Sequence, residues 1–127
     1  MSTHKIGIIT CSNAVNELSC CSVCCLADLD KRQGSFAQYP TEDRVRLVGI
    51  ISCAGCPTLA YPEKIMSKVH SLAQFKAGTI HFSYCMVDTC PFQSRFAEAI
   101  RKQHPNILLV KNKKNICAKI PSLTAMY

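Results

Sequence analysis

Cysteines follow three apolar runs of the sequence, each at the place where the run ends. Cys11 follows "KIGIIT", Cys53 follows "LVGIIS" and Cys85 follows "TIHFSY". Cysteine thiolates bind zinc and iron–sulfur clusters, and they also attack disulfides. The pattern therefore indicates either metal binding or thiol redox chemistry, provided that the fold brings these cysteines together.

Further cysteines lie close to each of the three. Cys56 completes a Cys53-x-x-Cys56 motif, and Cys90 lies five residues after Cys85, directly before Pro91. The stretch "SCCSVCCLA" at 19–27 adds four more, which are Cys20, Cys21, Cys24 and Cys25. Residues three or four apart share a helical face whereas adjacent residues do not, so we expect two of these four to face a common site and two to pack as small apolar residues. Cys117 is the weakest candidate ligand.

The elements that position these cysteines can be predicted from apolar patterning. Short, continuously apolar runs rich in β-branched residues are typical of buried strands. Four such runs predict strands at Ile6–Ile9, Val45–Ile51, Thr79–Tyr84 and Ile107–Val110. Amphipathic patterns predict helices at about 18–33, 62–76 and 91–105, ended by Gly34, Gly78 and Pro105. The segment 35–44 is predicted to be a loop.

This alternation of strands and helices predicts an α/β fold, Rossmann-like and three-layered, with about four parallel strands and helices on both faces. Right-handed crossovers bring the carboxyl ends of parallel strands to one edge of the sheet. Cys11, Cys53 and Cys85 should therefore meet at one rim, which is where open α/β sheets bind ligands. We expect one domain over residues 1–110, followed by a basic extension over 111–127.

The composition favours a metal-binding or redox protein over a disulfide-stapled one. Ten of the 127 residues are cysteine, far above ordinary usage. The N-terminal stretch "MSTHKIGIIT" lacks the apolar core of a signal peptide, and no run is long enough to span a bilayer. We therefore expect a cytoplasmic protein with no membrane contact, where clustered cysteines serve as metal ligands or redox groups.

The charge is basic, with a formal net charge of +7 concentrated at 101–104 and 111–119. No aromatic residues are interleaved with these basic stretches, so nucleic-acid binding is not expected and a solvated basic surface is the preferred interpretation. A polyanion-binding adaptor that uses the tail is the remaining alternative, and removal of 111–127 would test it. No acid–base pair, Ser-His-Asp set or glycine-rich phosphate loop supports catalysis. His81 is predicted to pack in the sheet, and His4, His70 and His104 to face solvent.

Several motifs taken in order resemble the CGGC-domain family over residues 5–110: "KIGIITC", Cys20-x4-Cys25, the G-x-F-x-x-Y of 34–39, "VGIISCAGCP" and "IHFSYC…CPF". The resemblance implies a cytoplasmic, cysteine-rich metal-binding domain with a Rossmann-like core that holds zinc or an iron–sulfur cluster. It also implies a set of ligands, which are Cys11, Cys20, Cys25, Cys53, Cys56, Cys85 and Cys90. Ala54 stands where the family has the first glycine of its motif, and Cys21, Cys24 and Cys117 look additional.

An iron–sulfur cluster is the expected cofactor and zinc is the alternative. Both accept four thiolates, but seven matched cysteines exceed what one tetrahedral zinc can use. The Cys-Pro pairs at 56–57 and 90–91 are also similar to those of ferredoxin-type sites. The expected role is electron transfer, cluster handling or redox sensing, with a redox or metal-trafficking protein as partner. The competing hypothesis is a dithiol oxidoreductase that uses Cys53 and Cys56, because a strand followed by C-x-x-C and a helix is typical of thioredoxin-like proteins.

Overall fold

The computed structural model describes residues 3–10, 23–52, 63–89 and 93–112 of the chain. In chain order the elements are β1 (Thr3–Thr10), α2 (Val23–Lys31), the 3-10 helix η1 (Gly34–Gln38), β2 (Arg44–Ser52), α3 (Glu63–Gln74), β3 (Thr79–Phe82), α4 (Tyr84–Thr89), α5 (Gln93–Gln103) and β4 (Leu108–Lys111). The strands form one sheet in the order β2-β1-β3-β4, with every pairing parallel. The predicted four-stranded parallel α/β fold is therefore confirmed.

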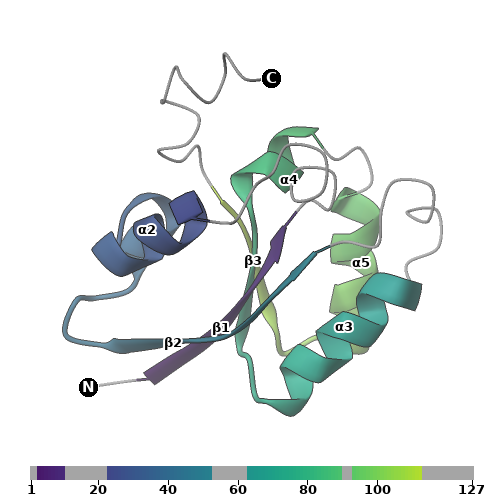
Figure 1. The fold of residues 1–127 in the computed structure, drawn as a ribbon. Helices are drawn as coiled ribbons and strands as arrows, with labels where there is room; N and C mark the ends of the chain where they lie inside the picture. Colours follow the sequence, from purple (N-terminus) through teal and green to yellow (C-terminus); the bar gives the residue numbers. More distant parts are fainter. Residues whose placement is uncertain (1–2, 11–22, 53–62, 90–92, 113–127) are drawn as a thin grey trace.

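Helices cover both faces of the sheet, as Figure 1 shows. The α2 helix and η1 lie on one face, while α3 and α5 lie side by side on the other. Successive side chains of a strand point to opposite faces, so Ile8 of β1 packs in the cluster beneath α2 and Ile9 packs in the cluster beneath α3 and α5. Three layers result. Within the described part of the chain, no helix is long and apolar enough to cross a membrane.

Paired glycines bring α3 close to the sheet. Gly7 of β1 and Gly49 of β2 are Cα partners, just after a register shift between Ile6 and Gly7. Both lie beneath Leu72 of α3, where a Cβ added to Gly7 would lie 2.7 Å from Cδ1 and one added to Gly49 would lie 3.2 Å from Cδ2. The absence of side chains at these positions thus leaves the space that the buried Leu72 side chain fills.

The left-handed residues that follow α2 and α3 are basic residues rather than the predicted glycines. Arg32 and Lys76 have left-handed backbone angles, with φ of 53° and 67°. In each helix the N–H of the following residue donates to the carbonyl five residues earlier, at 2.8 and 3.1 Å, which is the Schellman arrangement. Gly34 instead begins η1, and the Gly78 N–H donates to the Lys5 carbonyl at 2.9 Å. Glycine is favoured at such ends but not required, which is why the sequence pattern missed them.

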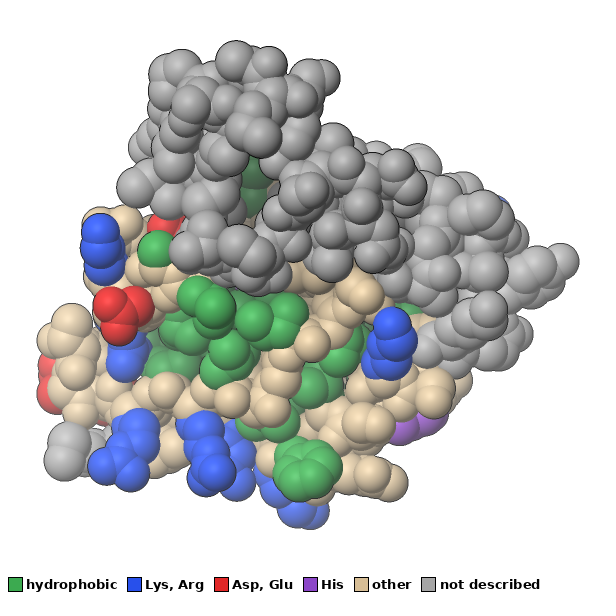
Figure 2. Space-filling view, viewed as in Figure 1, with side chains coloured by type: hydrophobic (Ala, Val, Ile, Leu, Met, Phe, Trp, Pro, Cys, Tyr) green, Lys and Arg blue, Asp and Glu red, His purple; other side chains and the backbone are tan. Residues whose placement is uncertain are grey.

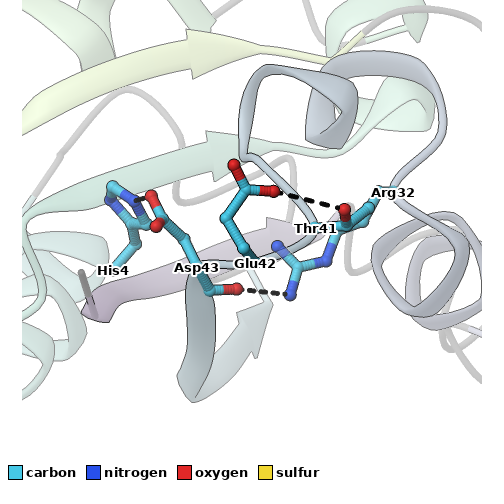
Figure 3. Close-up of polar contacts among 5 residues, drawn as sticks. All are labelled: His4, Arg32, Thr41, Glu42 and Asp43. Carbon is cyan, nitrogen blue, oxygen red and sulfur yellow. Dashed lines mark hydrogen bonds and ion pairs between the residues drawn. The ribbon is translucent and has the colours of Figure 1, made fainter. Parts of the chain in front are cut away.

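Asp43, in the loop before β2, forms hydrogen bonds with β1 and with the residue that follows α2, as Figure 3 shows. Its carboxylate is hydrogen-bonded to the ring of His4 in β1, with Nε2 and Oδ2 2.9 Å apart. Its backbone carbonyl accepts a hydrogen bond of 3.2 Å from the guanidinium of Arg32. The side chain of Arg32 therefore holds the end of α2 next to the start of β2.

The third strand is shorter than predicted. It ends at Phe82, and the chain turns at once into α4. The buried Ser83 lies at the N-cap position, where its hydroxyl accepts a hydrogen bond of 3.4 Å from the Met86 N–H. Cys85 consequently lies in the first turn of a helix, and not in an extended segment.

Candidate metal centre

The strands that precede the predicted cysteine ligands end level with one another. Thr10 and Ser52, the last residues of β1 and β2, are Cα partners. Phe82, the last residue of β3, pairs with Ile9, and the Ser83 N–H donates to the Ile9 carbonyl at 2.9 Å. The carboxyl ends of β1, β2 and β3 thus form one rim.

The rim coincides with the point where the strand order reverses. The chain passes from the central β1 to β2 by way of α2, on one face, and from β3 to β4 by way of α5, on the other. Loops that leave neighbouring strands toward opposite faces open a crevice, and open α/β sheets bind their ligands there. The topology therefore offers a binding position between the ends of β1 and β3.

Two of the seven predicted ligands lie in the described residues, with their backbone in helices: Cys25 in α2 and Cys85 in α4. The other five lie outside the described residues, and these are Cys11, Cys20, Cys53, Cys56 and Cys90. Along the chain, Cys11 directly follows Thr10 and Cys53 directly follows Ser52. Cys85 comes three residues after the end of β3. Ligation by these seven residues stays a prediction.

Cys25 belongs to α2 and is buried where this helix packs on the sheet. The residue is 7% exposed and belongs to the cluster formed with Ile6, Ile8, Phe36 and Tyr39. Apolar surroundings disfavour the charged thiolate. This environment favours the neutral thiol form of Cys25.

Lys68 of α3 brings a positive charge to the rim, which the sequence patterns did not indicate. Its ammonium donates a hydrogen bond of 2.8 Å to the carbonyl of Ser52, the residue before Cys53. A nearby cation lowers the pKa of a thiol and offsets the negative charge of metal-bound thiolates. The contact joins residues 16 apart in sequence, so no local pattern could reveal it.

By contrast, many Lys and Arg side chains visible in Figure 2 lie along the edge where β1 begins, on the side of the molecule away from the rim. The net charge of +7 therefore reflects a broad surface distribution as well as the basic stretches noted above. Lys68 is distinguished from that group by its contact with the end of β2.

A buried polar network lies within the sheet on the α2 side. The Tyr39 hydroxyl donates to Nε2 of His81 at 2.7 Å, and Nδ1–H of His81 donates to Oδ1 of Asn112 at 2.7 Å. Burial lowers the pKa of His81, opposed by its hydrogen bond with Asn112. Burial raises the pKa of Tyr39, opposed by a hydrogen bond with Thr79. Both nitrogens of His81 are occupied, so this residue is packed in the sheet as predicted.

The described side chains do not by themselves form a metal site. In the four described segments, no group of three or more His, Cys, Asp or Glu side chains could hold an ion. A thiolate centre at the rim must therefore draw on the cysteines of 11–22, 53–62 and 90–92, the segments that adjoin the ends of β1, β2 and α4. The donor set itself, cysteine sulfur from several segments of the chain, fits zinc or an iron–sulfur cluster.

Comparison with known families supports the resemblance seen in the sequence. The family model described as CGGC domain matches residues 5–114. No curated protein and no solved structure matches the chain.

Proposed function

Given that this chain belongs to the CGGC-domain family, whose model spans residues 5–114, we propose that it holds a metal cofactor at the carboxyl rim of its parallel sheet. The proposed cofactor is an iron–sulfur cluster, with zinc as the alternative. Its ligands are Cys11, Cys53 and Cys85, with one or more of Cys20, Cys25, Cys56 and Cys90. The observation that carries the proposal is the pairing of Thr10 with Ser52, because a cysteine follows each of these partners.

The residues around the rim suit a thiolate-bound group. An iron–sulfur cluster, when bound, accepts and releases single electrons. Lys68 supplies a positive charge beside the end of β2, which favours the thiolate form of nearby cysteines. The N–H of Ser83 is bonded to Ile9, and its hydroxyl accepts from Met86. These bonds hold the start of α4, and with it the backbone of Cys85, against β1.

Electron transfer, cluster handling and redox sensing are the roles that this centre would support, in a cytoplasmic protein. In each role the centre exchanges electrons or the metal group with another molecule. We therefore propose a redox or metal-trafficking protein as the physiological partner.

The substitution Cys53→Ser tests the proposed centre, with Cys117→Ser as the matched control. We expect Cys53→Ser to lose most of the bound metal when the protein is purified without oxygen, whereas Cys117→Ser keeps it. Equal metal content in the two variants and the wild type would contradict the assignment of Cys53 as a ligand.

A dithiol oxidoreductase is the second candidate, because the Cys53-x-x-Cys56 motif follows a parallel strand and precedes α3. In that reaction the Cys53 thiolate attacks a substrate disulfide and releases one substrate thiolate. Cys56 then attacks the mixed disulfide, which releases the second thiolate and leaves the Cys53–Cys56 pair oxidised by two electrons. If this candidate is correct, the protein reduces insulin disulfides with dithiothreitol as the electron source, and Cys53→Ser abolishes that activity while its metal content equals that of the wild type.

A further inference from the structure

Two histidines, His70 within α3 and His104 directly after α5, face each other on the α3–α5 layer. Nε2 of His104 lies 2.7 Å from Nδ1 of His70, and the two ring centroids are 4.8 Å apart at an interplanar angle of 66°. One nitrogen of this pair carries the shared hydrogen and the other offers a lone pair. The pair is exposed, although its members are 34 residues apart in sequence.

The backbone holds both residues where they are. His70 lies within α3 and directly follows Val69, which is fully buried in the core. The His104 N–H donates to the Ile100 carbonyl at 2.7 Å, and the His104 carbonyl accepts from the Ile107 N–H at 3.1 Å. Ile100 is likewise fully buried. The approach of the two rings is therefore set by the packing of α3 against α5.

Two imidazole nitrogens at this separation are close to the arrangement of metal ligands. Imidazole suits zinc, nickel and copper, and with bonds of about 2.0–2.1 Å a tetrahedral ion separates two nitrogens by about 3.3 Å. Binding of an ion requires the two nitrogens to move apart by about 0.6 Å from the observed 2.7 Å, and the rings to turn so that both lone pairs point at the ion. The shared hydrogen then moves, by way of water, to the other nitrogen of the same ring. Because His70 is exposed, its side chain can rotate into this arrangement.

The surroundings permit a divalent ion. Ser67, Ser71 and Gln74 lie one turn or less from His70 on α3 and are uncharged. Lys68 is engaged at the Ser52 carbonyl. Arg101 is exposed to solvent one turn before His104, where water screens its charge.

We propose that His70 and His104 form a second, thiol-free site for a divalent transition-metal ion such as Zn²⁺. No third His, Cys, Asp or Glu among the described residues completes it, so water fills the remaining positions. The site lies about 10 Å along α3 from Glu63, at 1.5 Å per residue, and α3 runs away from the rim. It is therefore separate from the proposed thiolate centre, and with two protein ligands it releases its ion more readily.

Zinc binding to the anaerobically purified protein, with any rim cofactor in place, tests this proposal. Equilibrium dialysis counts the ions bound, and ¹⁵N spectra of the imidazole rings identify the coordinating nitrogens. We expect His70→Gln and His104→Gln each to bind one Zn²⁺ fewer than the wild type, and the double variant to lose no more than either. In the wild type, Zn²⁺ should shift Nδ1 of His70 and Nε2 of His104. The control His4→Gln should bind as much as the wild type.

Equal zinc binding by the wild type and both variants would overturn the proposal, as would spectra in which these two nitrogens do not respond to Zn²⁺. The spectra also keep the test valid if a variant folds poorly, since they are recorded on the wild-type chain. Cys53→Ser should retain this ion while it loses the rim cofactor. The two proposals can therefore fail independently.

Discussion

Thr10 and Ser52, the final residues of β1 and β2, are Cα partners in a parallel pairing, and a cysteine follows each of them. Neighbouring parallel strands lie about 4.8 Å apart, so the chain leaves the sheet at two adjacent points toward Cys11 and Cys53. The end of β3 lies beside β1 at the same level, because Phe82 pairs with Ile9. This relationship is the basis on which we propose a shared thiolate centre.

Removal of the positive charge at the rim should weaken that centre. We predict that Lys68→Gln raises the pKa of the Cys53 thiol and lowers metal affinity by about three- to tenfold, since a nearby cation favours thiolate. The pH dependence of alkylation at Cys53 in the metal-free protein, followed by peptide mass spectrometry, measures the pKa. Lys102→Gln is the control, because Lys102 is exposed and lies 3.8 Å from Glu98. An identical response of the two variants would contradict a role for Lys68.

Buried His81 should make the folded state sensitive to acid. Burial lowers the pKa of His81 in the folded state, whereas in the unfolded chain its pKa is about 6.5. The unfolded state therefore binds more protons below that pH, and the free energy of unfolding falls as the pH drops from about 6.5 toward the folded-state pKa. Urea denaturation from pH 7.5 to 5 should show a steeper loss for the wild type than for His81→Gln. Parallel pH profiles would rule out this contribution.

A side chain at Gly7 should force Leu72 to shift. We predict that Gly7→Ala destabilises the protein by about 1–2 kcal/mol, because a Cβ there lies 2.7 Å from Leu72 in a packed core. Gly49→Ala should cost less, since its nearest Leu72 atom is at 3.2 Å. Combining Gly7→Ala with Leu72→Ala should recover part of the loss relative to the sum of the two single changes, as urea denaturation would show. Strict additivity would disprove the clash.

The end of α3 offers a stabilising substitution. Lys76 has a φ of 67°, and glycine adopts this conformation without the Cβ penalty. We predict that Lys76→Gly raises the free energy of unfolding by about 0.5–1 kcal/mol. Arg32→Gly should gain less, because it also removes the hydrogen bond to the Asp43 carbonyl. An equal gain at both positions in thermal denaturation would show that this hydrogen bond contributes nothing.

The strands could be predicted because short, continuously apolar runs, such as the one ending at Ile9, are typical of buried strands. Their parallel arrangement could be predicted because helical patterns separate them along the chain. The helical position of Cys85 was harder to predict. The short α4 begins at a single N-cap residue, Ser83, which stands within an apolar stretch of the sequence. The ends of α2 and α3 were missed because Arg32 and Lys76 adopt a conformation that composition assigns to glycine.

The features of the site that the sequence did not predict are contacts between residues far apart in the chain. His70 is exposed as the sequence predicts, but its approach to His104 depends on how α3 packs against α5. The contact of Lys68 with Ser52 similarly requires the crossover to be in place. Sequence patterns describe one element at a time, whereas these contacts arise only when elements meet.

The most direct test of a metal centre in this CGGC-domain protein is the content of iron, zinc and acid-labile sulfide after purification without oxygen, together with a visible spectrum. We predict bound iron with sulfide and a broad absorption near about 400 nm, typical of thiolate-ligated clusters, while stoichiometric zinc without colour would identify the alternative cofactor. A folded protein that contains none of the three and binds none on reconstitution would contradict the account.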